Sequence, residues 1–277
     1  MVQIITDSST LYTVDQAHEM GFEAVPLCVS IGDLDGRDLH MDYDRFYNAI
    51  ASGQHPKSSQ PPIGDVIEAF EKYPEDDIIN ISMADGLSGT YQSACGAREM
   101  VENRENITVI NSRTLCGPHR YMVTMAQKMK EEGKTAKEII DWVVQKSHET
   151  DSWLLPQDFG FLRRGGRMTP AAAAFGSVLK LKPVLCLTED SKRLDKFAIK
   201  RTFSSAVKAI LDSLKDKAFG SDYIFYVVHA RAHKDCQTAV DLIKQYFPKV
   251  EIQTYELSHA FITQGGPACV AIQYIKK

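Results

Sequence analysis

Short apolar runs alternate with helical patterns through the first half of the chain. Between the runs, apolar residues recur at intervals of three to four, which is the spacing of a helix with one buried face. Strands are predicted at Val2–Thr6, Phe22–Ile31, Ile78–Ser82 and Ile107–Ile110. Helices are predicted at Tyr12–Met20, Asp42–Ser52, Ile63–Lys72, Thr90–Asn103 and near Arg120–Lys130. This alternation favours a mostly parallel sheet with helices on its faces.

The second half of the chain has a less regular pattern. Its predicted elements are helix Ala136–His148, an alanine-rich helix after Pro170, the apolar run Leu181–Leu187, a hairpin-like turn at Thr188–Lys196, helix Ser204–Lys215, strand Tyr223–His229, helix Asp235–Tyr246, strand Glu251–Leu257 and a final helix. We therefore expect two α/β domains, residues 1–152 with a mostly parallel Rossmann-like sheet and residues 153–277 as the second domain.

Charge and composition narrow the class of protein. The net charge of −4 argues against a dedicated nucleic-acid binder, which would carry a basic stripe. No apolar run reaches the about 18 residues that a membrane span needs, and the first residues lack a signal-peptide pattern. A cytoplasmic protein is expected, with at most transient membrane contact. The 6 cysteines have no zinc-site spacing, so neither a metal nor a disulfide framework is expected.

The most informative segment runs from Leu87 to Ala94. Ser88, Gly89 and Thr90 fall where a buried strand gives way to a helix. Unpaired backbone N–H groups and the positive end of the helix dipole favour an anion there. A helix cap is the simpler interpretation, but Gly86 and Gly89 also remove side chains where a ligand could approach the backbone.

Two further polar segments follow predicted strands. Ser58 and Ser59 either bind an anion or cap the helix that starts at Ile63, and taken alone the cap is favoured. Asp7 and Ser8 follow the first strand, at the sheet edge where open α/β folds bind ligands. For them, capping and lining a site are equally compatible with the sequence.

Other kinds of site find less support. No segment matches a Walker phosphate loop or a dinucleotide-binding glycine motif. A serine hydrolase with Ser88 or Ser59 as nucleophile would need a histidine base, and its class has the turn Gly-x-Ser-x-Gly. The chain has Gly86-Leu-Ser-Gly89, one residue short of that motif, and His229 at a strand end is a weak candidate for the base.

A basic cluster stands out on an otherwise acidic chain. It comprises Arg163, Arg164 and Arg167, and Lys200 with Arg201 extends it. A solvated turn is the default interpretation, and the alternative is a docking surface for an acidic partner.

Taken together, these segments resemble the DegV family of bacterial fatty-acid-binding proteins, in order and over nearly the whole chain. The matching segments are Thr6-Asp-Ser8, Val25-Pro-Leu27, Ser58-Ser-Gln-Pro61, Leu87-Ser-Gly-Thr-Tyr-Gln-Ser-Ala94, Val109-Ile-Asn-Ser-Arg113, Phe161-Leu-Arg-Arg-Gly-Gly-Arg167, Leu181-Lys-Pro-Val184, Lys200-Arg201 and Gly265-Gly-Pro267.

The resemblance implies two α/β domains with one long-chain fatty acid in a tunnel between them. It implies that Ser58, Ser59 and Ser88 hold the carboxylate, with Gly89 and Thr90 beside Ser88. A fatty acid kinase would then convert the bound acid to an acyl-phosphate for phospholipid synthesis. The protein would be a binding subunit without catalytic residues, metal or cofactor. The rivals are a hydrolase or acyltransferase that uses Ser88, and a lipid sensor without a kinase partner.

Several positions depart from the family pattern or extend it. Gln264 stands where the family has a histidine that supports the carboxylate network, and Gln cannot titrate. Asn111 stands where aspartate is common, and Ser58 where threonine is common. Gln264, Asp7 and Ser8 are predicted to support the binding residues. The predicted tail contacts are Phe159, Phe161, Phe175, Leu179, Leu185 and Phe261.

Overall fold

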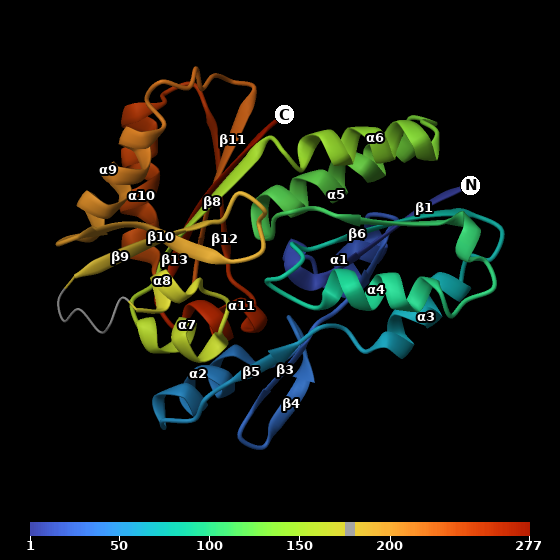
Figure 1. Ribbon diagram of the computed structural model, residues 1–277, viewed down its shortest axis with the longest axis horizontal. Coiled ribbons are helices and arrows are strands. Elements are labelled where there is room, and N and C mark those ends of the chain that lie inside the picture. Colours follow the sequence, from blue (N-terminus) through green and yellow to red (C-terminus); the bar gives the residue numbers. More distant parts are fainter. Residues whose placement is uncertain (175–180) are drawn as a thin grey trace. The chain divides into compact units, whose positions relative to one another are not determined.

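The computed structural model describes residues 1–174 and 181–277, which fall into two compact units (Figure 1). The N-terminal unit comprises Met1–His148 together with Ser258–Ala260. The C-terminal unit comprises Glu149–Leu257 and Phe261–Lys277. The N-terminal unit is therefore discontinuous in the sequence, because Ser258–Ala260 belongs to it.

The N-terminal unit is built on a four-stranded parallel sheet in the order β2-β1-β6-β7. Its strands are β1 (Val2–Asp7), β2 (Glu23–Val25), β6 (Asp77–Ser82) and β7 (Ile107–Asn111). Its helices are α1 (Val14–Glu19), α3 (Ile63–Glu71), α4 (Thr90–Arg98), α5 (Cys116–Glu131) and α6 (Ala136–Lys146), with short 3₁₀ turns η1 (Ser8–Thr10) and η2 (Arg104–Asn106). The predicted parallel α/β arrangement is confirmed.

Both faces of this sheet are buried, which explains the unbroken apolar runs in its strands. Ile5 and Ile78 belong to a cluster with Val66, Phe70 and Ala94 of α3 and α4. The pair α5 and α6 packs on β1 and β6, and Figure 1 shows it on the opposite face from α3 and α4.

A second, antiparallel sheet in this unit has the order β4-β3-β5. It comprises β3 (Cys28–Ile31), β4 (Leu34–Arg37) and β5 (Lys57–Ser59), with helix α2 (Tyr43–Ala51) in the β4–β5 connection. The prediction of one strand over Phe22–Ile31 is wrong, because the chain leaves the parallel sheet at Pro26. Proline has no N–H to donate to a ladder.

The C-terminal unit has a six-stranded mixed sheet in the order β10-β9-β8-β13-β11-β12. Its strands are β8 (Thr150–Leu155), β9 (Lys182–Leu187), β10 (Leu194–Lys200), β11 (Tyr223–His229), β12 (Glu251–Glu256) and β13 (Val270–Lys276). Its helices are α7 (Phe159–Gly165), α8 (Pro170–Ala173), α9 (Phe203–Ser213), α10 (His233–Tyr246) and α11 (His259–Gly265), whose first two residues belong to the other unit.

The core of this unit lies between the sheet and the pair α9 and α10, which lie side by side in Figure 1. Ile210, Phe225, Val227 and Ile272 are fully buried there. The hairpin predicted around Thr188–Lys196 is confirmed, since β9 and β10 pair antiparallel on either side of it. The sequence predicted a helix as the last element, but helix α11 is followed by strand β13, which was not predicted. Among the residues described, no helix is both long and apolar enough to span a bilayer.

Candidate anion site in the N-terminal unit

Three parallel strands of the N-terminal unit end at polar residues. These are Asp7 of β1, Ser82 of β6 and Asn111 of β7, and the strands are hydrogen-bonded neighbours. The loops that follow them therefore leave the sheet at one edge, where open α/β sheets bind ligands.

Asp7 fixes two of these loops. Its Oδ1 accepts a hydrogen bond from the Ser9 N–H at 2.8 Å, which caps η1. Its Oδ2 accepts a hydrogen bond from the Met83 N–H at 2.9 Å, just after β6. The carboxylate is buried and has backbone partners on both oxygens, so Asp7 holds the loops in place.

Ser8 joins β1 to the start of β3. Its Oγ donates a hydrogen bond to Asp38 over 2.8 Å and accepts one from the Leu27 N–H over 3.1 Å. Asp38 in turn accepts a hydrogen bond from the Ala260 N–H at 3.0 Å. Ser8 thus anchors two segments that are distant in the sequence.

The loop after β6 is shaped by a glycine and an asparagine. Gly86 has φ 87°, a left-handed conformation that side chains disfavour. Asn111 Oδ1 accepts hydrogen bonds from the N–H groups of Asp85 and Arg113, at 3.2 and 2.9 Å. An aspartate could accept the same two bonds, so the asparagine keeps the loop anchored without adding a negative charge beside it.

Ser88 and Thr90 form a pair of hydroxyls at the start of α4. Their oxygens are 2.8 Å apart, and Ser88 Oγ also accepts a hydrogen bond from the Thr90 N–H at 3.3 Å. If Thr90 Oγ1 donates within the pair, Ser88 accepts twice and keeps its own proton for a ligand. Ser88 is half-buried and Gly89, the N-cap, is exposed. The Ser88 hydroxyl can therefore donate a hydrogen bond to an anion, either a free ion or the charged group of a bound molecule.

The second predicted segment lies beside this helix start. Gln60 follows β5, and a Cβ atom on Gly89 would lie 3.1 Å from the Gln60 Oε1. The Gln60 amide therefore lies close to the Ser88–Thr90 turn. Ser58 is half-buried and Ser59 exposed, and both pair with β3.

The cap interpretation of Ser58 and Ser59 is wrong. Both residues belong to strand β5, and the N-cap of α3 is Pro62, which makes no side-chain capping bond. The two serines are therefore not occupied by helix capping, which was the simpler explanation for them.

Two buried titratable residues of this unit, Asp38 and His259, were not predicted from the sequence. Burial raises the pKa of Asp38 to about 6, although the Ala260 N–H and the Ser8 hydroxyl oppose the shift. Burial lowers the pKa of His259 to about 4. His259 Nδ1 lies 3.9 Å from Asp38 Oδ1, and its ring stacks on Tyr43 at a centroid distance of 3.9 Å. The only local sign of the pair in the sequence is that Asp38 follows β4 and His259 begins the last helix, α11.

His119 is a third buried polar residue that the sequence did not single out. Its Nδ1 lies 2.7 Å from Ser9 Oγ and its Nε2 lies 3.0 Å from the Ile81 carbonyl oxygen. Burial lowers the pKa of His119, which favours the neutral ring. In a neutral ring whose Nε2 donates to the carbonyl, Nδ1 accepts from the Ser9 hydroxyl. His119 connects α5 to the sheet edge and has no contact with Ser88 among the bonds described.

The remaining predicted residues lie in the C-terminal unit. Gln264 is in α11, and its amide packs so closely on Gly165 that a Cβ there would lie 2.1 Å from the Gln264 Oε1. Phe161 is buried, and Gly266 leaves room for its ring. Phe159 packs beside the cluster that contains the buried Leu185. Phe261 is half-buried in α11, and Phe175 and Leu179 lie outside the described residues.

The basic cluster is helical at its start. Arg163 and Arg164 occupy the last turn of α7, so the interpretation as a solvated turn is wrong for them. Both are exposed, and the Arg164 guanidinium lies 4.7 Å from the centre of the Phe161 ring. Arg167 follows the helix and donates to the Gly165 carbonyl. Lys200 and Arg201 are exposed at the end of β10.

Comparison with known proteins places these features in one family. A family model described as "Uncharacterised protein, DegV family" matches residues 1–277. The DegV domain-containing protein BH3627 of Halalkalibacterium halodurans is 29% identical over 283 residues, covering 100% of this chain and 99% of the relative. The DegV domain-containing protein SA0704 of Staphylococcus aureus is 33% identical over 226 residues, covering 78% of this chain and 77% of the relative.

Solved structures agree with the fold. The crystal structure of DegV of Bacillus subtilis, described as a fatty acid binding protein, has a TM-score of 0.84 at 26% identity and covers 100% of this chain and 99% of its own. A DegV family protein of Eubacterium eligens, described as loaded with heptadecanoic acid, has a TM-score of 0.85 at 22% identity and covers 100% of both chains. With a whole-chain family match, curated relatives and the same two-domain α/β fold, this chain belongs to the DegV family.

Proposed function

We propose that the protein binds a long-chain fatty acid and presents its carboxylate to a fatty acid kinase. The observation that carries the proposal is the hydroxyl pair of Ser88 and Thr90 at the start of α4, with the side chain of Gln60, the residue after β5, close to Gly89. The proposed carboxylate contacts are Ser58, Ser59, Ser88, Gly89 and Thr90. Gln264, Asp7 and Ser8 are proposed as supporting residues, the last two through the loops that they anchor.

The chemistry of these groups suits a carboxylate. Hydroxyl and backbone N–H donors form charge-assisted hydrogen bonds, which are about twice as strong as neutral ones. The positive end of the α4 dipole adds to the attraction, typically by 0.3–1 kcal/mol. The α4 start supplies both kinds of donor.

The acyl tail would supply most of the binding free energy. Each methylene that leaves water contributes roughly 0.8 kcal/mol, so a long chain outweighs an imperfect head-group site. The proposed tail contacts are the apolar residues named from the sequence. The related DegV of Bacillus subtilis, described as a fatty acid binding protein, supports a ligand of this class.

The proposed reaction belongs to the kinase. An oxygen of the bound carboxylate attacks the γ-phosphorus of ATP, which gives an acyl-phosphate for phospholipid synthesis and releases ADP. The proposed docking residues are Arg163, Arg164, Arg167, Lys200 and Arg201, whose charges suit an acidic partner surface.

The rival interpretation is a hydrolase with Ser88 as nucleophile. Such an enzyme needs a base in hydrogen-bond reach of the serine. Within the described residues, the hydrogen bonds of the Ser88 hydroxyl are to Thr90, and His229 instead accepts a bond from the Ala232 N–H. These contacts favour a binding role for Ser88.

The test is the affinity of Ser88→Ala for a fluorescent long-chain fatty acid. Loss of one hydrogen bond to a charged group costs about 1.5–3 kcal/mol, so we expect binding to weaken by about tenfold or more. Ser52→Ala is the matched control, because Ser52 is exposed in the same unit and its hydroxyl donates to the nearby Ala49 carbonyl. Equal affinity of the two variants would remove Ser88 from the site.

A further inference from the structure

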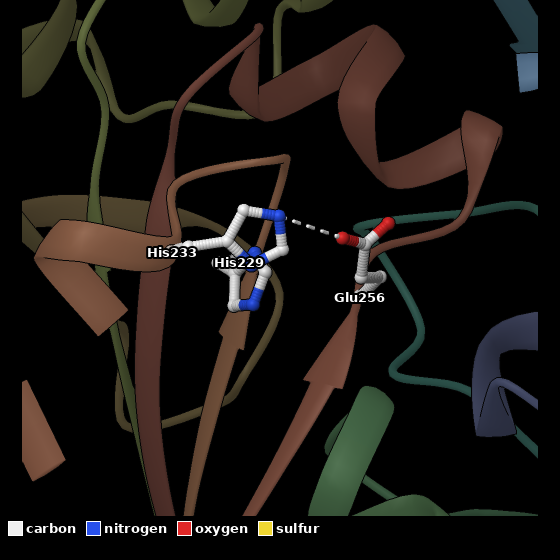
Figure 2. A group of neighbouring side chains, drawn as sticks. All are labelled: His229, His233 and Glu256. Carbon is white, nitrogen blue, oxygen red and sulfur yellow. Dashed lines mark ion pairs between the residues drawn. The ribbon is translucent and has the colours of Figure 1, made fainter. Parts of the chain in front are cut away.

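Two histidines and a glutamate gather at one end of the sheet in the C-terminal unit (Figure 2). His229 is the last residue of β11, Glu256 is the last residue of β12, and His233 is the first residue of α10. β11 and β12 run parallel, and His229 and Glu256 are partners in their register. The backbone therefore brings the imidazole and the carboxylate to the carboxyl end of adjacent parallel strands, where α/β sheets bind ligands.

A tight turn returns the chain to this point. Residues Ala230–Ala232 connect β11 to α10, and the two imidazole rings come within 4.8 Å, centre to centre. In Figure 2 both rings lie over the end of β11, with His233 directed at Glu256. Three elements thus each contribute one side chain to a single small volume.

The ligand atoms lie close enough together to be brought into the geometry of a metal site by side-chain rotation. One ligand atom from each residue lies within 4.8 Å of the other two, and His233 Nε2 is 3.5 Å from Glu256 Oε1. Ligands bound to zinc at 2.0–2.1 Å in a tetrahedron are roughly 3.3 Å apart. The His233 and Glu256 side chains are 75% and 47% exposed, so small rotations can close the remaining gap.

The buried member of the cluster, His229, has a ring nitrogen that accepts a hydrogen bond. Its Nδ1 accepts a hydrogen bond from the Ala232 N–H over 3.2 Å, so the ring has a lone pair and is not an imidazolium. This bond is at the long end of the usual range, and a metal ion can compete with it.

We propose that His229, His233 and Glu256 form a binding site for a divalent transition metal of the zinc class. Two imidazoles and one carboxylate suit zinc-class ions, whereas calcium and magnesium prefer sites made of oxygen ligands alone. Three protein ligands leave a coordination position for water or another ligand. The proposal is independent of the fatty acid, because no residue of the proposed carboxylate site takes part.

The carboxylate has a particular role in this site. His233 begins α10, and the positive end of that helix opposes a cation. Glu256 supplies the compensating negative charge, so its neutral isostere should bind metal poorly. Cys236, three residues further along α10, does not belong to this cluster of ligand atoms.

The test uses the full chain, first stripped with a chelator and then titrated with zinc ions against a chromophoric competitor. We expect one ion per chain, and at least tenfold weaker binding for His233→Ala and for Glu256→Gln. His55→Ala is the control, because His55 is exposed and lies outside the cluster. It should bind zinc like the parent. Both test positions are exposed, and unchanged thermal unfolding of the stripped variants would verify that they fold.

Cobalt substitution provides a second readout. Cobalt(II) bound by two imidazoles and a carboxylate should give visible ligand-field bands without a thiolate charge-transfer band. The proposal is overturned if zinc does not saturate at one site, if His233→Ala or Glu256→Gln binds like the parent, or if cobalt produces the thiolate band.

Discussion

At the scale of single residues, Asp38 and His259 are buried neighbours whose pKa values move in opposite directions. The pKa of Asp38 is raised by burial to about 6, so the folded protein holds a proton that the unfolded chain loses above about pH 4. Its contribution to stability is present at low pH and is lost as the pH rises through 6. The pKa of His259 is lowered by burial to about 4, so its contribution is present above pH 6.5 and is lost as the pH falls towards 4.

The two effects should largely cancel between about pH 4 and 6. We expect His259→Phe, which keeps a ring against Tyr43 and Phe46, to lose stability as the pH rises through this window. Asp38→Asn should instead gain stability as the pH rises. Urea unfolding of the parent and both variants at several pH values measures these slopes. A stability of His259→Phe that rises with pH would contradict the assigned direction for Asp38.

The sequence identified some polar residues of the N-terminal unit and missed others. Ser88 and Asp7 could be identified because each follows a recognisable apolar strand. Asp38 could not, because one of its hydrogen-bond partners, Ala260, is 222 residues away. His119 was missed for the same reason, since its partners Ser9 and Ile81 lie on other elements. Tertiary contacts of this kind leave no local pattern.

At the scale of elements, the loop between β6 and α4 depends on its two glycines for different reasons. Gly86 has φ 87°, so Gly86→Ala should destabilise the protein by about 1 kcal/mol through backbone strain. Gly89 has φ −73°, which any residue adopts, so Gly89→Ala should leave stability nearly unchanged. Its Cβ would instead displace the Gln60 amide from the helix start.

The measurements for this pair are urea unfolding and fatty-acid affinity. We expect Gly89→Ala to weaken binding without loss of stability, because the Cβ would push the Gln60 amide away from the start of α4. Gly86→Ala serves as its comparison for stability. If Gly89→Ala bound fatty acid with the affinity of the parent, the contact between Gln60 and the start of α4 would not contribute to fatty-acid binding.

Element prediction failed where short apolar runs carry little information about period. Val270–Lys276 follows a Gly-Gly-Pro segment and ends the chain as β13, although a helix was expected to be last. Helix α7 was missed because its sequence is rich in glycine and arginine, yet Asp158 caps it through the Gly160 N–H. The strongly periodic helices α2, α3 and α9 were predicted to within about two residues.

At the scale of the whole molecule, the alternation of strands and helices was enough to predict two α/β domains. It could not predict that Ser258–Ala260 returns to the N-terminal unit, where Ala260 bonds to Asp38. The chemistry of the site needed the family resemblance, because a hydroxyl-rich helix start is compatible with several anions.

The proposed docking surface includes Arg201, whose charge should attract an acidic kinase partner. Arg201→Glu should leave the fatty-acid content unchanged but reduce acyl-phosphate formation from ATP by an added fatty acid kinase, since reversed charge repels an acidic partner. Lys249→Glu is the matched control, because Lys249 is an exposed cation elsewhere in the same unit. Equal activity of both variants would exclude Arg201 from docking. No acyl-phosphate from the parent itself would favour a lipid sensor.

Mass spectrometry of the purified protein shows whether a fatty acid is its ligand. Native spectra and organic extracts should both contain a long-chain fatty acid, at one molecule per chain. Ser88→Ala should retain less of it than Ser52→Ala under the same purification. A protein that carries no fatty acid as purified, and takes none up after incubation with long-chain fatty acids, would contradict the proposal that it binds one.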